Sequence, residues 1–192
     1  MTIPQLCCEG RPLQFACACL LAAITLISLP TSAHAADGQV WGGLAVANAN
    51  DGADGGQWGP GAQLGFRTGI SDFWSFVGGV DASYHFSSTD DDLEIPSAQV
   101  LGLFGGFRYN LDIFQYIPYV GLSVVNFAAA PPTEPGEEVS RVAAKLSVGV
   151  DWRYSREWSV GGVVELHAPL DEPDTFPFYS TLGVNLAYHF RL

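Results

Sequence analysis

Alternation of apolar and polar side chains, the pattern of a β-strand with one apolar face, runs through most of the chain after residue 36. The last stretch is the clearest example. Every second residue from Leu182 to Leu192 is apolar, and the intervening side chains are small or polar. The same period predicts eight strands, at residues 38–48, 57–70, 73–86, 97–110, 116–128, 140–154, 157–168 and 178–192.

The connections between these strands alternate between long and short. Those at 49–56, 87–96, 129–139 and 169–177 are long and rich in Asp, Glu, Pro and Gly, whereas those at 70–73, 110–113 and 155–157 are short. Bacterial outer-membrane barrels have long extracellular loops, short periplasmic turns and both termini on the periplasmic side. The sequence therefore predicts an all-β fold, an eight-stranded antiparallel transmembrane β-barrel, in which strand 178–192 pairs with strand 38–48.

The first thirty-five residues have the features of a secretory signal peptide. An apolar run from Phe15 to Leu29 leads to Ala33-His34-Ala35, which matches a signal-peptidase site. We therefore predict a signal peptide at 1–35, a barrel domain at 36–192 and localisation in the outer membrane. All four cysteines lie in the predicted signal peptide, so the exported domain forms no disulfide.

Charge narrows the choice of partner. The chain carries 20 Asp+Glu against 8 Lys+Arg, a net charge of −12, which disfavours nucleic acid as a ligand. Twelve of the acids lie in the long connections: Asp51, Asp54, Asp90, Asp91, Asp92, Glu94, Glu134, Glu137, Glu138, Asp171, Glu172 and Asp174. This distribution predicts acidic extracellular loops that carry a structural or surface-interaction role.

Aromatic residues gather at the predicted strand ends, as they do at membrane interfaces. One predicted girdle, at the periplasmic edge, contains Trp74, Phe107, Tyr109, Trp152, Tyr154, Trp158, Tyr188 and Phe190. The other, at the outer edge, contains Trp58, Tyr84, Phe86, Phe127, Phe178 and Tyr179. The alternative is a soluble barrel of the lipocalin kind, but the polar faces are mostly Gly, Ala, Ser and Thr, which suits a narrow lumen better than a solvated wall.

Three segments resemble the small eight-stranded outer-membrane barrels of the OmpA transmembrane-domain and OmpX-like superfamily. They are Phe104-Gly-Gly-Phe-Arg-Tyr-Asn110, Pro118-Tyr-Val-Gly-Leu122 and the hairpin from Leu146 to Trp158. The resemblance implies insertion by the barrel-assembly machinery through a C-terminal signal, here Tyr188, Phe190 and Leu192. It also implies contact with outer-membrane lipid and lipopolysaccharide. The family usually ends in an aromatic residue, and this chain ends in Leu192.

Charged residues of both signs are predicted to face the lumen and to pair there, because an unpaired charge away from water costs several kcal/mol. The predicted network contains Arg67, Asp81, Arg108, Lys145, Asp151, Arg153, Glu165 and Arg191. Glu165 is expected to pair with Lys145 or Arg67, and Asp151 with an arginine. We favour a lumen plugged by salt bridges, with a small pore as the alternative.

An enzymatic alternative rests on His85-Phe86-Ser87, an H-x-S triplet of the kind that lipid A deacylases use. The third member would be Glu94 or Asp90. Residues 85 and 87 share the polar face of their strand, which predicts that they point away from lipid acyl chains. We therefore predict a protein that is not an enzyme.

No cofactor or metal site is predicted from the sequence. His167 and His189 lack metal-ligand spacing with each other or with a carboxylate, and both are interpreted as lumen fillers. The run Asp90-Asp91-Asp92-Leu93-Glu94 lacks the alternating ligands and central glycine of an EF-hand loop, so it is interpreted as a solvated acidic loop. A weaker hypothesis is that these acids collect divalent cations that bridge the protein to lipopolysaccharide.

Overall fold

The computed structural model describes residues 37–50, 57–90, 93–95, 97–111, 115–130, 139–170 and 178–191. The predicted signal peptide, 1–35, lies outside the described residues. Among the residues that are described, no helix is long and apolar enough to cross a membrane.

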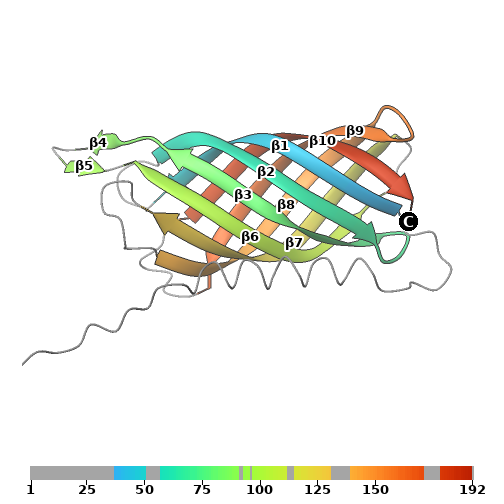
Figure 1. Ribbon diagram of the computed structural model, residues 1–192, viewed down its shortest axis with the longest axis horizontal. Helices are drawn as coiled ribbons and strands as arrows, with labels where there is room; N and C mark the ends of the chain where they lie inside the picture. The colour runs from blue at the N-terminus through green and yellow to red at the C-terminus, as the bar shows by residue number, and fades with distance from the viewer. Residues whose placement is uncertain are drawn as a thin grey trace, which may run out of the picture. The chain divides into compact units, whose positions relative to one another are not determined.

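Eight antiparallel strands of the described chain close into a barrel (Figure 1). They are β1 (Asp37–Asn50), β2 (Gln57–Gly69), β3 (Trp74–His85), β6 (Ala98–Asn110), β7 (Tyr116–Ala130), β8 (Val139–Arg153), β9 (Trp158–Pro169) and β10 (Phe178–Arg191). Around the barrel their order is β1-β10-β9-β8-β7-β6-β3-β2. The eight predicted strands are confirmed, each within two residues at either end.

The second long connection carries an addition that the sequence pattern did not predict. Within the predicted loop 87–96, β4 (Ser88–Asp90) and β5 (Leu93–Ile95) pair as a small separate hairpin. β-branched residues such as Thr89 and Ile95 favour the extended backbone on either side of the acidic turn. The hairpin continues from β3 beyond the barrel wall (Figure 1).

The barrel closes where the first and last strands meet. β1 and β10 pair antiparallel along their full lengths, with Gly38 opposite Phe190 and Asn50 opposite Phe178. A methyl group on Gly38 would collide with the Phe190 ring, so the glycine gives that ring room to lie over the seam. The predicted partnership between the last strand and the first is therefore confirmed.

Side chains alternate strictly between the two faces of the wall. On β10, Leu182, Val184 and Leu186 are exposed on the outside, while the residues between them are buried inside. The same holds on β7, where Leu122 is 63% exposed although it lies near the middle of its strand. A continuous band of exposed aliphatic residues on a closed sheet is the lipid-facing surface of an outer-membrane barrel.

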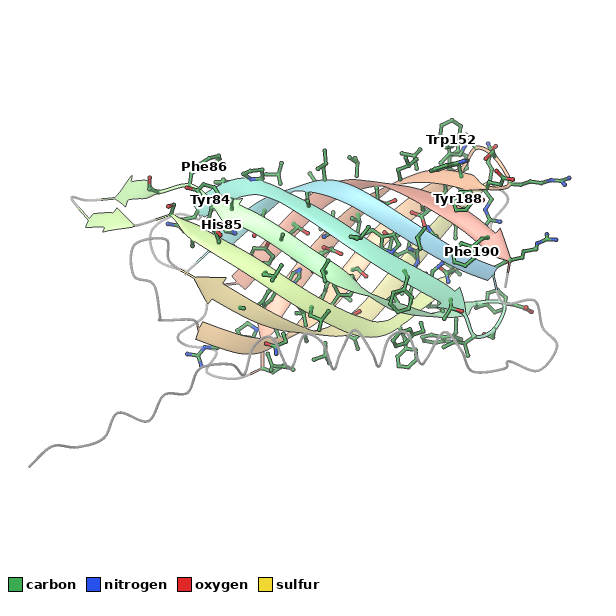
Figure 2. All side chains as sticks on the ribbon, in the orientation of Figure 1. Tyr84, His85, Phe86, Trp152, Tyr188 and Phe190 are labelled. Carbon is green, nitrogen blue, oxygen red and sulfur yellow. The ribbon has the colours of Figure 1, made fainter. Side chains whose placement is uncertain are left out.

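The aromatic residues at the barrel ends follow the prediction only in part. Figure 2 places Tyr84 and Phe86 at one end, and Trp152 and Tyr188 at the other, and all four are exposed. Two residues predicted for the outer girdle, Phe127 and Tyr179, are instead buried in the lumen at 1% and 4% exposure. Their strand parity puts them there, because Phe127 lies two residues beyond Val125, and Tyr179 two residues before Thr181, both of which face inward. The side chain of Phe178 lies outside the described residues.

Replacing Leu122 with Arg tests the lipid-facing band. A cation at the bilayer midplane costs about 2–4 kcal/mol, falling to about 0–1 kcal/mol near the interface. We therefore expect Leu122→Arg to lower the free energy of unfolding by about 2–4 kcal/mol in urea titrations of vesicle-inserted protein. The matched control is Gln115→Arg, at an exposed short turn. Equal stability of the two variants would contradict the assignment of this face to lipid.

Candidate functional site

The lumen contains a cluster of opposite charges drawn from opposite walls, the carboxylate–lysine cluster (Asp81, Lys145 and Glu165). The Lys145 ammonium lies 2.8 Å from Asp81 Oδ2 and 2.9 Å from Glu165 Oε1. Asp81 is on β3 and Glu165 on β9, and three strands separate these two in either direction around the barrel. Lys145, from β8, therefore ties two opposite sides of the wall together.

Neighbouring side chains fix this cluster in place. Glu165 Oε2 accepts a hydrogen bond from the Gln63 amide and one of 2.9 Å from Thr181 Oγ1. These bonds leave Oε1 for Lys145. The lysine ammonium also lies 3.9 Å from the centre of the Phe104 ring, a cation–π contact in a site that excludes bulk water. Side chains from β2, β6 and β10 thus support a cluster that itself comes from β3, β8 and β9.

A second group, the arginine cluster (Arg67, Arg108, Arg153 and Asp151), lies closer to the short turns. Arg108 forms an ion pair of 2.5 Å with Asp151 and stacks 3.2 Å from the centre of the Tyr119 ring. Arg108 and Arg67 also donate to the same atom, Asn110 Oδ1, at 2.7 and 3.2 Å. Asp151 therefore pairs with Arg108, and Asn110 links Arg108 to Arg67.

The predicted lumen network is brought together with one exception. Arg153 is half-buried in the lumen wall, and its Nε is buried without a hydrogen-bond partner. Arg191 is exposed, so its assignment to the lumen is wrong. It is the last residue of β10, where the barrel interior ends and a long side chain reaches solvent. Of the two partners considered for Glu165, the structure places Lys145 beside it.

The histidine of the H-x-S triplet pairs with a different serine from the one that the sequence suggested. His85 Nε2 lies 3.1 Å from Ser83 Oγ, which accepts a 2.9 Å hydrogen bond from the Tyr179 hydroxyl. His85 Nδ1 lies 3.2 Å from the Gln57 carbonyl oxygen. Ser87 is exposed and takes no part in this chain of bonds. His85 lies at the same barrel end as Tyr84 and Phe86 (Figure 2).

The other two lumen histidines are built into very different surroundings. His189, near the short turns, lies 2.8 Å from Ser159 Oγ through its Nε2. His167 is only 1% exposed, and neither of its ring nitrogens has a hydrogen-bond partner. Its ring is packed against those of Tyr179 and Phe127, with centroid distances of 4.8 and 5.1 Å. His167, which is on the same strand as Glu165, is thus held in place by ring packing alone.

Little free space remains in the lumen. A cavity of about 40 Å³ lies between the two charged clusters, with Gln39, Lys145, Arg108 and Asp151 among its lining residues. A water molecule needs about 10–15 Å³ of such volume, so the cavity holds a few waters at most. Gln39 and Asp151 line this cavity, and Gln39 Oε1 and Asp151 Oδ1 are buried without a protein partner, so water in the cavity would satisfy them.

The predicted insertion residues lie on the outer face of the seam. Tyr188 stacks on Phe190 with ring centroids 6.4 Å apart, and its other side meets Trp158 at 5.1 Å. Figure 2 shows Tyr188 and Phe190 at one end of the barrel. Leu192 lies outside the described residues. Recognition of this segment by the barrel-assembly machinery remains a proposal.

Several residues that build the site were not predicted from the sequence. They are Gln39, Ser83, Phe104, Asn110, Tyr119, Phe127, Ser159, Tyr179 and Thr181. Strand parity could have found most of them. Phe104, for example, lies four residues before Arg108 on the same inward face, and Tyr119 lies four residues before the inward-facing Ser123.

The sequence matches the family described as outer membrane protein beta-barrel domain over residues 19–190. The chain belongs to this family, and its location is the outer membrane. A comparison with curated protein sequences gives no match.

Solved structures with the same fold come from several Gram-negative outer membranes. Neisserial surface protein A is 14% identical with a TM-score of 0.62, covering 80% of this chain and 97% of its own. Ail, the attachment invasion locus protein of Yersinia pestis, is 13% identical with a TM-score of 0.55, covering 82% and 100%. OprG of Pseudomonas aeruginosa is 13% identical with a TM-score of 0.52, covering 82% and 97%. At such identities the similarity shows the fold alone.

Replacing Arg108 tests the arginine cluster. Arg108→Met leaves Asp151 buried without its partner, and breaking a buried ion pair from one side costs about 3–5 kcal/mol. We expect that loss in urea unfolding of vesicle-inserted protein, and partial recovery when Asp151→Asn is added, because the uncompensated charge is then gone. Arg156→Met, at an exposed turn, is the control and should stay within about 0.5 kcal/mol of the parent. Equal effects of Arg108→Met and Arg156→Met would refute the ion pair's contribution.

Proposed function

We propose that this protein is a closed, non-enzymatic outer-membrane barrel with a structural or surface-interaction role, carried by its acidic extracellular loops. The observation that carries the proposal is the Lys145 ammonium, which bonds carboxylates on opposite walls at 2.8 and 2.9 Å. A lumen that is cross-linked in this way is plugged, so the surfaces outside the lumen carry the function.

Packing on both sides of this bridge supports the plug. Toward the long connections, the rings of Phe127, His167 and Tyr179 fill the cross-section. Toward the short turns, Arg108 pairs with Asp151 and lies over the Tyr119 ring. The cavity of about 40 Å³ that lies between these layers supports a closed lumen.

The geometry of the histidine–serine pairs argues against a lipid A deacylase. Ser83 and His85 are buried inside the barrel, and so are Ser159 and His189. A lipid acyl chain meets the outer wall, where aliphatic side chains stand, and it reaches neither pair. Neither of these two buried serines is therefore placed to act as the nucleophile on a lipid substrate.

The charge of the long connections indicates the chemistry of a surface partner. Their twelve acids lie mostly outside the described residues, but the sequence gives these segments no Lys or Arg except near their borders. Ail has been solved in complex with the heparin analogue sucrose octasulfate, a polyanion. Acidic loops repel such a ligand, so for this chain the matching partners are cationic surfaces, or anionic lipopolysaccharide bridged through divalent cations.

Planar bilayer recording tests the plug. We expect purified protein to give no sustained open level, because the charged and aromatic layers leave no continuous path for hydrated ions. Replacing both bulky rings in a Phe127→Ala, Tyr179→Ala variant should still leave the Lys145 bridge and the arginine cluster closed. A steady conductance from the parent protein would refute the plug and favour the small pore.

Removing the acidic run tests the role of the loops. We expect the triple variant Asp90→Asn, Asp91→Asn, Asp92→Asn to lose calcium-dependent binding to lipopolysaccharide vesicles, measured by co-sedimentation with and without Ca²⁺. The parent should bind more strongly with Ca²⁺, and high salt should weaken its binding, because exposed charges are screened. The control is Glu157→Gln, an exposed acid at a short turn. Identical calcium responses of parent and triple variant would overturn this part of the proposal.

A further inference from the structure

Three potential metal ligands converge in the lumen at the edge of the carboxylate–lysine cluster. Asp81, Glu165 and His167 each present a ligand atom, and these atoms lie within 4.8 Å of one another. Glu165 and His167 are two residues apart on the inward face of β9, and Asp81 reaches them from the opposite wall. Two carboxylate oxygens and one imidazole nitrogen are a common ligand set for divalent transition metals.

Two of these three side chains, Asp81 and His167, carry polar atoms without a protein partner. Asp81 Oδ1 and both ring nitrogens of His167 are buried without a hydrogen bond. The small cavity does not explain them, since neither Asp81 nor His167 lines it. A buried imidazole with neither nitrogen bonded is costly unless something else binds it.

The local charge of the carboxylate–lysine cluster also favours a cation. The cluster has two carboxylates, and Lys145 supplies one positive charge close to both. Gln63 and Thr181 bond Glu165 Oε2, which orients Oε1 toward the cluster in the way that supporting residues orient a metal ligand. The rings of Phe127 and Tyr179 hold His167 in one orientation.

We propose that Asp81, Glu165 and His167 form a binding site for one divalent transition-metal ion, with Zn²⁺ as the representative, and that the Lys145 ammonium competes for it. The ammonium occupies the space between the carboxylates that the ion would take. Lys145 has a long flexible stem and already contacts the Phe104 ring, so it can move aside toward that ring. The site therefore binds metal weakly in the parent protein and more tightly once the lysine charge is removed.

The test compares metal binding by protein refolded from urea into detergent in the presence of Zn²⁺ or Co²⁺. Excess metal is removed by gel filtration, and stoichiometry, affinity and the visible Co²⁺ spectrum are measured. All proteins carry the three Asn substitutions at 90–92, so that the acidic run contributes no binding. Heat-modifiable gel mobility shows that each variant is folded.

We expect Lys145→Met to bind one metal ion at least about tenfold more tightly than the parent, since a competing hydrogen-bonded charge is gone. Adding His167→Gln should reduce that affinity at least about tenfold and remove the Co²⁺ band that a nitrogen ligand gives. The matched control, His189→Gln, replaces a lumen histidine outside the site and should leave binding unchanged.

Two outcomes overturn the proposal. One is a Lys145→Met variant that binds no more tightly than the parent, and the other is His167→Gln with unchanged affinity and spectrum. If Lys145→Met does not fold, Lys145→Gln is used in its place, because glutamine keeps a hydrogen-bond donor to the carboxylates. The comparison of His167→Gln with His189→Gln in the parent background does not depend on either lysine variant.

Discussion

Closure of the sheet between β1 and β10 is the constraint on which the rest of the molecule depends. Within a bilayer every backbone amide and carbonyl needs an internal partner, and only a sheet without edges provides it. The seam pairs residues 37–50 with 178–191 without a break, and Gly38 makes room there for the Phe190 ring. Once the sheet is closed, the odd or even position of a residue along its strand alone decides whether its side chain faces lipid or lumen.

The narrow interior then decides what the inward residues can be. Eight strands leave a lumen just wide enough to be filled by side chains, so charges placed there cannot be solvated and must meet each other. Lys145 reaches carboxylates on two opposite walls, and Arg108 reaches both Asp151 and Asn110. Opposite the buried Asp151, the neighbouring strand contributes only Gly161.

The sequence predicted most of the wall and part of the lumen. Period-two alternation located all eight strands, and the need to pair buried charges suggested Lys145 for Glu165 and an arginine for Asp151. The sequence alone could not predict that Asp81 lies beside Lys145, because contacts across a barrel depend on strand stagger, which no single strand encodes. An aromatic residue near a strand end fits either the membrane interface or the lumen, so the sequence predicts a girdle position for Phe127 and Tyr179. Only the alternation of faces along each strand shows that both point into the lumen. The prediction for Arg191 failed because the alternation of faces no longer places a side chain in the lumen where the barrel wall ends.

The two charged clusters give the lumen an electrostatic gradient along its axis. Toward the long connections, two carboxylates face one ammonium, and toward the short turns three guanidinium groups face one carboxylate. Under the predicted orientation, we propose that the acidic loops raise the local concentration of cations outside and that the carboxylate–lysine cluster holds one. The arginine cluster behind it repels the same ion, and with few waters between them the repulsion is weakly screened. With the metal site and the plug that we propose, the lumen would bind a cation without conducting it.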